Sequence, residues 1–388
     1  MDSIQIELDI IKIPIKKIGN NIGNLRKIIT TIKNKINFKE LDITYNNYKI
    51  NNKQHYKTLK ILKFLYNNEL LSESLEKHSI IEQNKFNNFI KTNNNEELGN
   101  WINNTGGDIM KQVNYLANSN QIPSNLYNSY IDINILNNFV ELNILDYLFN
   151  KLDYKHVYNI LYKNLTINLV IYSKNKFIKK DLLNGIIIRI ITVGLFKSNT
   201  TKIIINVDIF LTQFKKKINK DSKILGPREI NSGFSQTNIK ICIFRSEELN
   251  KVLVHELIHY LELDLQNVEF NNFHFIFNIP KSNTIRLNEA YTEILALLIN
   301  SIIISNNITT NTSILNNEFK FSLYQVAKIL IFYGFDNAND FFQPNNNNKF
   351  NQNTSIFSYF IVKTLLLYNL NIFLSLYYKN ELTKYNFK

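Results

Sequence analysis

The segment KVLVHELIHY, residues 251–260, decides the fold of this chain, because it combines a buried-helix pattern with two histidines four residues apart. On a helix, this spacing places His255 and His259 one turn apart on the same face, where both imidazoles can face one metal ion. The flanking residues are apolar, and Glu256 is the only acidic residue in the five-residue core. With 6 histidines in 388 residues, chance gives this pattern in fewer than about 1 in 100 such chains. The segment therefore predicts a metal-binding helix inside the protein.

The glutamate in this segment indicates what the metal is for. The pattern HExxH is a signature of zinc peptidases. Glu256 stands beside the first histidine, close to the metal but not needed as a ligand, so it can take a proton from a water molecule whose pKa zinc has lowered. A purely structural zinc site has no use for such a base. The segment therefore favours hydrolysis, with Zn²⁺ as the cofactor and Glu256 as the general base.

A catalytic zinc ion usually has a third protein ligand, and the residues just after His259 do not supply one. The metzincin pattern HExxHxxGxxH is absent, because Glu262 stands where glycine is needed and Leu265 where the third histidine is needed. Further along, Glu289 and Glu293 in the run RLNEAYTE share one helix face. One carboxylate can bind the metal and the other can accept the free ring N–H of a ligand histidine. We expect Glu289 to be the ligand. The alternatives are Glu269, His274 and Glu293.

The pair HELIH and NEAYTE resembles the gluzincin metallopeptidases, in which HExxH is followed by NExxSD or a similar glutamate helix. The resemblance covers about fifty residues. It implies a zincin-like fold, zinc ligands at His255, His259 and Glu289, and Glu256 as the base. Asn288 and Glu293 fall where the family has a helix-orienting asparagine and an acid behind the ligands. The gap of 29 residues between His259 and Glu289 is longer than in those enzymes, so a segment containing residues 271–278 would loop out.

A second resemblance covers about the C-terminal half of the chain. The runs LGPREINSGFS (225–235), IKICIFRSEELNKV (239–252) and TSIFSYFIVK (354–363), with the two motifs, are similar to uncharacterised metallopeptidases of large nucleocytoplasmic DNA viruses. This resemblance implies a viral protein that acts inside an infected cell, in the host cytoplasm or the virion. It implies a polypeptide substrate without naming one.

Peptide hydrolysis also needs a group that stabilises the oxyanion of the tetrahedral intermediate. Gluzincins use a tyrosine or histidine from outside the two motif helices for this purpose. We expect Tyr359 in this role, with Tyr324 and His274 as alternatives. Among 21 tyrosines, any single one is more often a packing residue.

Substrate contacts are expected around the first motif helix. The strand 239–244 could be an edge strand that pairs with an extended peptide, and the turn 231–233 before it would then lie near the cleft. Arg245 and Arg286 flank the two motif helices. They could hold a substrate carboxylate, but pairing with nearby acids is the expected role.

The hydrophobic pattern predicts an α+β protein of two domains. Residues 1–160 are expected to form a mainly helical accessory domain, and residues 161–388 a zincin-like domain with a small mixed sheet, an active-site helix and a glutamate helix. Ser246 is expected to be the N-cap of the active-site helix. The expected strands are 166–173, 202–210 and 239–244, and the expected helices are 179–195, from Ser246 to about 263, and 287–301.

Composition limits the other possibilities. The net charge of +13 permits binding to nucleic acid, but the lysines are spread along the chain without an arginine-rich stripe, so nucleic-acid binding is not expected. One cysteine excludes an internal disulfide and fits a reducing compartment. Acidic residues in MDSIQIELDI stand where a signal peptide has basic ones, so secretion is not expected.

The most apolar long stretch, residues 356–378, contains Lys363, Asn369 and Asn371. These polar residues favour a buried C-terminal helix or helix pair over a membrane span, so stable membrane insertion is not expected. Two other functions remain open: a non-catalytic viral scaffold that zinc stabilises, and a basic nucleic-acid-binding protein.

Overall fold

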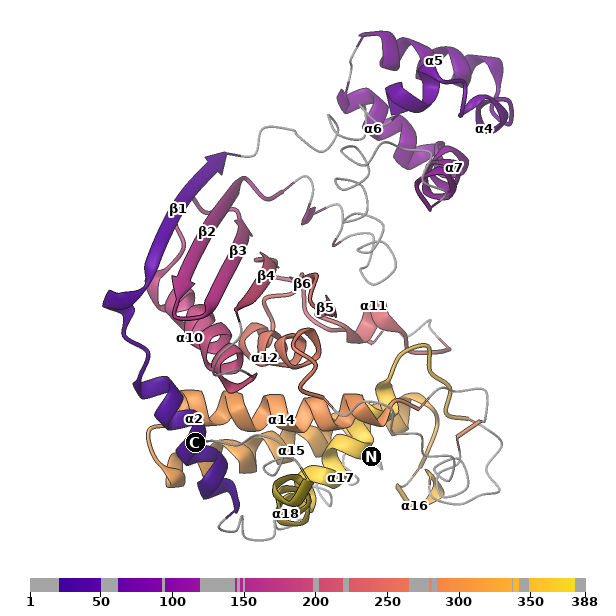
Figure 1. The fold of residues 1–388 in the computed structure, drawn as a ribbon. Coiled ribbons are helices and arrows are strands. Elements are labelled where there is room, and N and C mark those ends of the chain that lie inside the picture. The colour runs from indigo at the N-terminus through magenta and orange to yellow at the C-terminus, as the bar shows by residue number, and fades with distance from the viewer. Residues whose placement is uncertain are drawn as a thin grey trace. The chain divides into compact units, whose positions relative to one another are not determined.

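A computed structural model of the chain describes residues 21–49, 62–92, 95–118, 144, 147–148, 151–197, 202–218, 223–264, 279–280, 285–336, 338–341 and 349–380. The chain forms two compact units (Figure 1). The first combines Met1–Asn47 with His156–Lys388, and the second is Tyr48–Lys155. This division differs from the expected boundary at residue 160, because part of the N-terminal segment belongs to the same unit as the two motif helices.

The N-terminal helix α2 (Asn21–Asn34) shows why the first unit is discontinuous. Its apolar residues Ile22, Leu25 and Ile29 are buried in the main core. Its cations meet the C-terminal end of helix α14 (Leu287–Ile304): Lys33 Nζ donates to the Ile303 carbonyl at 2.6 Å. A helix C-terminus has unpaired carbonyl groups and a partial negative charge, so a cation is favourable there.

A six-stranded mixed sheet forms one layer of this unit, in the order β1-β2-β3-β4-β6-β5. Strands β3, β4 and β6 are parallel, and β5 runs antiparallel to β6 at the edge. The mixed α+β class is therefore confirmed. The strands are β1 (Asp42–Lys49), β2 (Tyr154–Tyr162), β3 (Leu165–Ser173), β4 (Ile203–Phe210), β5 (Gly233–Gln236) and β6 (Lys240–Ile243).

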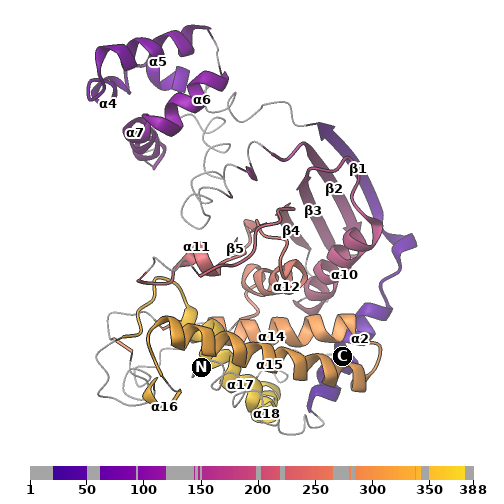
Figure 2. The same ribbon diagram turned by 180° about the vertical axis from the view of Figure 1, so that it is seen from behind.

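Helices cover the sheet in two successive layers (Figures 1 and 2). Helices α10 (Lys180–Lys197) and α12 (Leu249–Tyr260) pack together, and α12 contacts β5 and β6. Helix α14 packs on the other side of α12 and is followed by α15 (Ile308–Phe332). Buried apolar residues line every one of these contacts, which gives α12 a position between the sheet and α14. A helix enclosed on several sides in this way can hold polar groups away from water.

The three expected strands are present as β3, β4 and β6, and the expected helices as α10, α12 and α14. Strands β1, β2 and β5 were not expected. Two details of the prediction are wrong. Ser246 is not the N-cap, because α12 begins at Leu249 after Glu248, whose φ is 57°. The strand at 239–244 is not an edge strand, because β6 lies between β4 and β5.

The apolar stretch 356–378 forms helices, as expected. They are the π-helix η2 (Phe357–Val362), α17 (Lys363–Tyr368) and α18 (Leu370–Asn380). Among the described residues, α14 has the length and apolar composition of a membrane span, but 67% of that window is buried inside the protein. The same helix carries Glu289 and Glu293. Its apolar character is accounted for by its place in the core.

The remaining elements are short or belong to the second unit. In the first unit these are η1 (Phe38–Glu40), α11 (Pro227–Ile230) and α16 (Ala338–Phe341). The second unit contains α4 (Ser72–Leu75), α5 (Ile80–Thr92), α6 (Asn95–Asn104) and α7 (Gly107–Asn118). These helices enclose a separate core that includes Leu65, Phe86 and Trp101.

Candidate metal centre

Helix α12 brings the two motif histidines together inside the protein. The Nε2 atoms of His255 and His259 lie 3.1 Å apart. Only 5% of the His255 surface is exposed. The apolar neighbours Leu257 and Ile258 face the core, and this burial fixes the orientation of the helix. Two imidazole nitrogens this close together need either a shared proton or a common cation between them.

Glu289 from α14 completes a triangle with these two nitrogens. Its Oε2 atom lies 3.0 Å from His259 Nε2 and 3.5 Å from His255 Nε2. Around a tetrahedral zinc ion with bonds of about 2.0–2.2 Å, ligand atoms stand about 3.3–3.6 Å apart. The three edges of the triangle, at 3.0, 3.1 and 3.5 Å, are close to this spacing. The residues present therefore fit a zinc ion, and these three form the only potential metal-binding group of histidine, cysteine and acidic residues found among the described residues.

Each histidine has a carboxylate beside its Nδ1 atom, the ring nitrogen that faces away from the triangle. Glu293 Oε1 lies 3.1 Å from His255 Nδ1, an ion pair by distance rather than a well-aligned hydrogen bond. Asp264 Oδ2 lies 2.9 Å from His259 Nδ1 and is hydrogen-bonded to it. Carboxylates in this position fix the ring orientation of metal-binding histidines and increase their basicity. Glu293 thus lies beside a motif histidine, as expected for the second acid of α14, whereas Asp264 was not identified.

The end of α12 explains how Asp264 reaches the site. Helix α12 ends at Tyr260, and Glu262 adopts a left-handed conformation with φ 53°. The Leu263 N–H then donates to the Ile258 carbonyl at 2.9 Å, which turns the chain back toward the helix. This turn is the αL helix ending that many helices use. It places a carboxylate five residues after a histidine, beyond the reach of any helical spacing rule.

Without a metal, this arrangement favours charged side chains. Burial lowers the pKa of His255 and His259, but the hydrogen bonds that the rings donate to the carboxylates, together with charge attraction, outweigh burial and raise the pKa values to about 9 and about 10. Burial raises the pKa of Glu289 and Glu293. Their cationic neighbours lower both pKa values by more, so that both lie well below the usual range. The site therefore concentrates negative charge around two nitrogen ligands, as a binding site for a cation requires.

Glu256 faces the edge of the sheet beside the triangle. Its side chain is buried and hydrogen-bonds with Ser235 on strand β5. Burial raises the pKa of Glu256, and the two histidines and Ser235 lower it less. A carboxylate with a raised pKa is a better proton acceptor than a free one. Glu256 is thus placed between the metal ligands and strand β5.

Tyr359 reaches the same site from the π-helix η2. Its ring packs edge-on against His255 with the centroids 6.0 Å apart, and its hydroxyl hydrogen-bonds with Glu289. Burial and the surrounding carboxylates raise its pKa well above the ordinary value, so the hydroxyl keeps its proton. π-Helices occur often at functional sites. Of the alternatives, Tyr324 is exposed on α15 beneath Lys328, while Glu269 and His274 lie outside the described residues.

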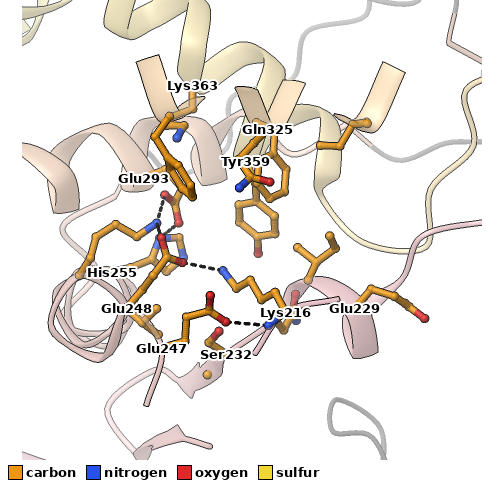
Figure 3. A pocket seen from close by; sticks show the side chains of 18 of the residues that line it. Lys216, Glu229, Ser232, Glu247, Glu248, His255, Glu293, Gln325, Tyr359 and Lys363 are labelled. Atoms are coloured by element: carbon orange, nitrogen blue, oxygen red, sulfur yellow. Dashed lines mark hydrogen bonds and ion pairs between the residues drawn. The ribbon is translucent and has the colours of Figure 1, made fainter. Parts of the chain in front are cut away.

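A cavity of about 270 Å³ opens from His255, Glu256 and Tyr359 (Figure 3). Residues of α11, β5, α12, α14, α15, η2 and α17 line it, and the turn 231–233 forms part of its wall. Figure 3 shows the Tyr359 hydroxyl pointing into this space. The expected position of the turn near the cleft is therefore confirmed.

Ion pairs that the sequence did not suggest hold one wall of the cavity. Lys251 Nζ lies 2.9 Å from Glu293 Oε2, so Glu293 connects Lys251 to His255. Lys216 Nζ lies 3.0 Å from Glu248 Oε2. Lys251 stands four residues before His255 on the same helix face, a spacing that could have indicated the contact. Lys216 is distant in sequence and gave no such signal.

Three further residues from the sequence analysis have smaller roles in the geometry. Asn288 is half-buried beside Glu289, and no hydrogen bond found among the described residues joins it to the triangle. Arg245 is buried and its Nη1 donates to the Glu229 carbonyl at 3.3 Å. Arg286 is exposed at the start of α14. Neither arginine lines the cavity.

Comparison with known proteins found a distant viral relative. A segment of 170 residues is 29% identical to an uncharacterised protein of Acanthamoeba polyphaga mimivirus. The match covers 40% of this chain and 42% of that protein, so the chain spans less than half the length of the relative it matches. No family model and no solved structure matches the chain. The chain is thus distantly related to a viral protein, in agreement with the viral resemblance drawn from its sequence.

Proposed function

We propose that this protein is a zinc-dependent peptidase of gluzincin type, with a zincin-like catalytic unit, that cleaves within polypeptide chains. The observation that carries the proposal is the triangle of His255 Nε2, His259 Nε2 and Glu289 Oε2, with edges of 3.0 to 3.5 Å. A general base and a partly buried tyrosine stand beside it. No single residue of this set is diagnostic, but together they contain each group that hydrolysis of an amide needs.

The zinc ion would be held by His255, His259 and Glu289. When bound, zinc supplies a Lewis acid that polarises the substrate carbonyl and lowers the pKa of water. Two histidines and one carboxylate are a common ligand set of catalytic zinc sites, which keep one position open. Asp264 and Glu293 hold the two imidazoles in the orientation that directs both Nε2 atoms at one point.

Glu256 acts as the general base. Its buried carboxylate takes a proton from the attacking water and later gives that proton to the leaving amine. Its raised pKa suits both steps, because the group must accept a proton and release it at neutral pH. Ser235 limits the rotation of the carboxylate through its hydrogen bond.

Tyr359 stabilises the oxyanion that develops on the substrate carbonyl. Its hydroxyl remains protonated, points into the cavity and lies among the ligand residues (Figure 3). A donor that is already oriented before reaction stabilises developing charge without reorganising. The hydrogen bond to Glu289 holds the hydroxyl at the triangle before substrate arrives.

Strand β5 supports binding of an extended peptide. It is the edge strand of the sheet, and its Ser235 contacts Glu256. An edge strand offers unpaired backbone groups to which a substrate chain can add as a further strand. This assigns to β5 the role that the sequence analysis gave to residues 239–244.

A comparison of the parent protein with Glu256→Gln separates this function from its alternative, a zinc-stabilised viral scaffold. Both proteins are expected to bind one zinc ion per chain, because Glu256 is not a ligand. Only the parent is expected to hydrolyse peptides from a broad mixture. One zinc ion in each protein with no hydrolysis by the parent would favour the scaffold, and no zinc in either would exclude both.

A further inference from the structure

The cavity beside the metal centre contains several charged side chains, and most of them are matched. Lys251 is paired with Glu293, and Lys216 with Glu248. Glu247 accepts a hydrogen bond from the Lys216 backbone at 2.7 Å. These contacts neutralise the wall formed by the start of α12. Lys363 lies beside this network, on the wall where α15 meets α17 (Figure 3).

Lys363 on that wall differs from the other deep cations. Only 6% of its surface is exposed, and its Nζ donates to the neutral Ser322 hydroxyl at 2.7 Å. Among the described residues, no carboxylate oxygen lies within ion-pair distance of this Nζ. Burial, followed by repulsion from Lys251, lowers the pKa of Lys363 to about 8. A buried cation with one neutral partner is costly unless an anion completes its coordination.

The geometry places this cation where a substrate would lie. Lys363 follows Tyr359 by four residues and lines the same cavity (Figure 3). Tyr359 contacts His255 of the metal centre, so Lys363 stands about one helical turn from a group at the reacting bond. The Ser322 hydroxyl also donates to the Glu318 carbonyl at 2.7 Å, which fixes the direction from which it accepts the lysine.

We propose that Lys363 binds the carboxylate of an aspartate or glutamate side chain next to the scissile bond, so that the enzyme selects acidic substrate residues. This inference rests on the proposed peptidase function. Attraction to Glu293, Glu318 and Glu248 only partly offsets the burial that lowers the pKa of Lys363, and no carboxylate oxygen of these three residues lies within ion-pair distance of its Nζ. A carboxylate brought by the substrate gives Lys363 a charge-assisted hydrogen bond, which is about twice as strong as a neutral one.

The specificity is tested by measuring peptide affinity in a protein that cannot cleave, so that the result does not depend on turnover. Zinc-loaded Glu256→Gln protein is titrated against capped, fluorescent peptides that carry glutamate, glutamine, leucine or lysine at either of two central positions. At one position, the glutamate peptide is expected to bind about 10- to 100-fold tighter than the glutamine peptide. Adding Lys363→Met is expected to reduce this ratio to below about 3-fold. Methionine has a similar length and no charge, so the cavity keeps its shape.

A matched control is Lys320→Met, a change of the same kind at an exposed position of α15 that does not line the cavity. It is expected to leave the ratio unchanged. Equal binding of glutamate and glutamine peptides, a preference for lysine, or a glutamate preference that survives Lys363→Met would each overturn the inference. Hydrolysis by the parent protein is assayed separately. A parent that cleaves peptides but shows no acidic preference refutes the specificity alone, whereas an inactive parent refutes the proposed function.

Discussion

Nδ1 of His259 lies 2.9 Å from Oδ2 of Asp264, a carboxylate that the turn after α12 returns to the helix. This contact leaves the other ring nitrogen, Nε2, facing His255 and Glu289. The relationship matters because a neutral imidazole carries its proton on one nitrogen only, and an acceptor at Nδ1 keeps the proton there. Asp264 therefore leaves Nε2 without a proton and able to act as the metal ligand that we propose.

Asp264→Asn is expected to weaken zinc binding about 10- to 100-fold, because an amide is a poorer acceptor for the His259 ring N–H. Competition against a chelator of known affinity measures the change. The control is Glu262→Gln, which alters an exposed acid in the same turn. Equal zinc affinity in the Asp264 variant and the control would show that the carboxylate has no role in the metal site.

Substitutions of the two α14 glutamates identify the third ligand. Glu289→Gln is expected to weaken zinc binding by far more than Glu293→Gln, because only Glu289 has an oxygen within 3.5 Å of both Nε2 atoms. Glu293→Gln is expected to lower affinity about 10- to 100-fold, as an acid behind a ligand does. If Glu293→Gln has the larger effect, the assignment is reversed.

The zinc-free protein is expected to lose stability as the pH rises. The pKa values of His255 and His259 are raised to about 9 and about 10 by their carboxylate partners. A raised pKa stabilises the folded state fully below the ordinary histidine value of about 6.5, and this contribution disappears as pH rises through the folded values. Thermal unfolding of the zinc-free protein between about pH 6.5 and pH 10 measures the effect.

The zinc-loaded protein provides the comparison for this pH series. Zinc replaces the protons on both Nε2 atoms, so its unfolding temperature is expected to change less over the same range. On the acid side, the depressed pKa values of Glu289 and Glu293 stabilise the fold above about pH 4.3, and this contribution is lost as pH falls. An unfolding temperature of the zinc-free protein that rises from pH 6.5 to pH 10 would contradict the assigned contacts.

Tyr359→Phe is expected to lower kcat about 100- to 1,000-fold while KM and zinc content change little, because the hydroxyl acts on the developing oxyanion. Steady-state kinetics with a cleaved peptide gives both constants. Tyr324→Phe removes a hydroxyl from an exposed tyrosine on α15 and serves as the matched control. A kcat for Tyr359→Phe within about 3-fold of that control would exclude the role.

Much of the candidate metal centre could be predicted from the sequence, because its proposed ligands obey helical spacing. His255 and His259 stand one turn apart on α12, and Glu289 and Glu293 one turn apart on α14. Both helices are apolar enough to require burial. Polar side chains on a buried helix need polar partners, so the histidine pair and the glutamate pair were expected to meet. The strands β3, β4 and β6 were equally clear, because each is a run of β-branched residues.

The rest depends on contacts that no local pattern encodes. Asp264 reaches His259 through a left-handed turn, and Lys216 reaches Glu248 across 32 residues. Strand β5 is only four residues long and contains glycine, so it does not resemble a strand in sequence. The packing of α2 on α14 had no signal in the sequence, because it joins residues that lie more than 270 positions apart.

The most direct test of the central claim is a zinc titration of peptide hydrolysis. The protein is freed of metal with a chelator, and its rate of cleavage of a peptide mixture is measured as zinc is returned. The rate is expected to be near zero without zinc, to rise in proportion to added zinc and to level off at one ion per chain. Hydrolysis that persists in the metal-free protein, or that is absent at one bound zinc ion per chain, would contradict the account.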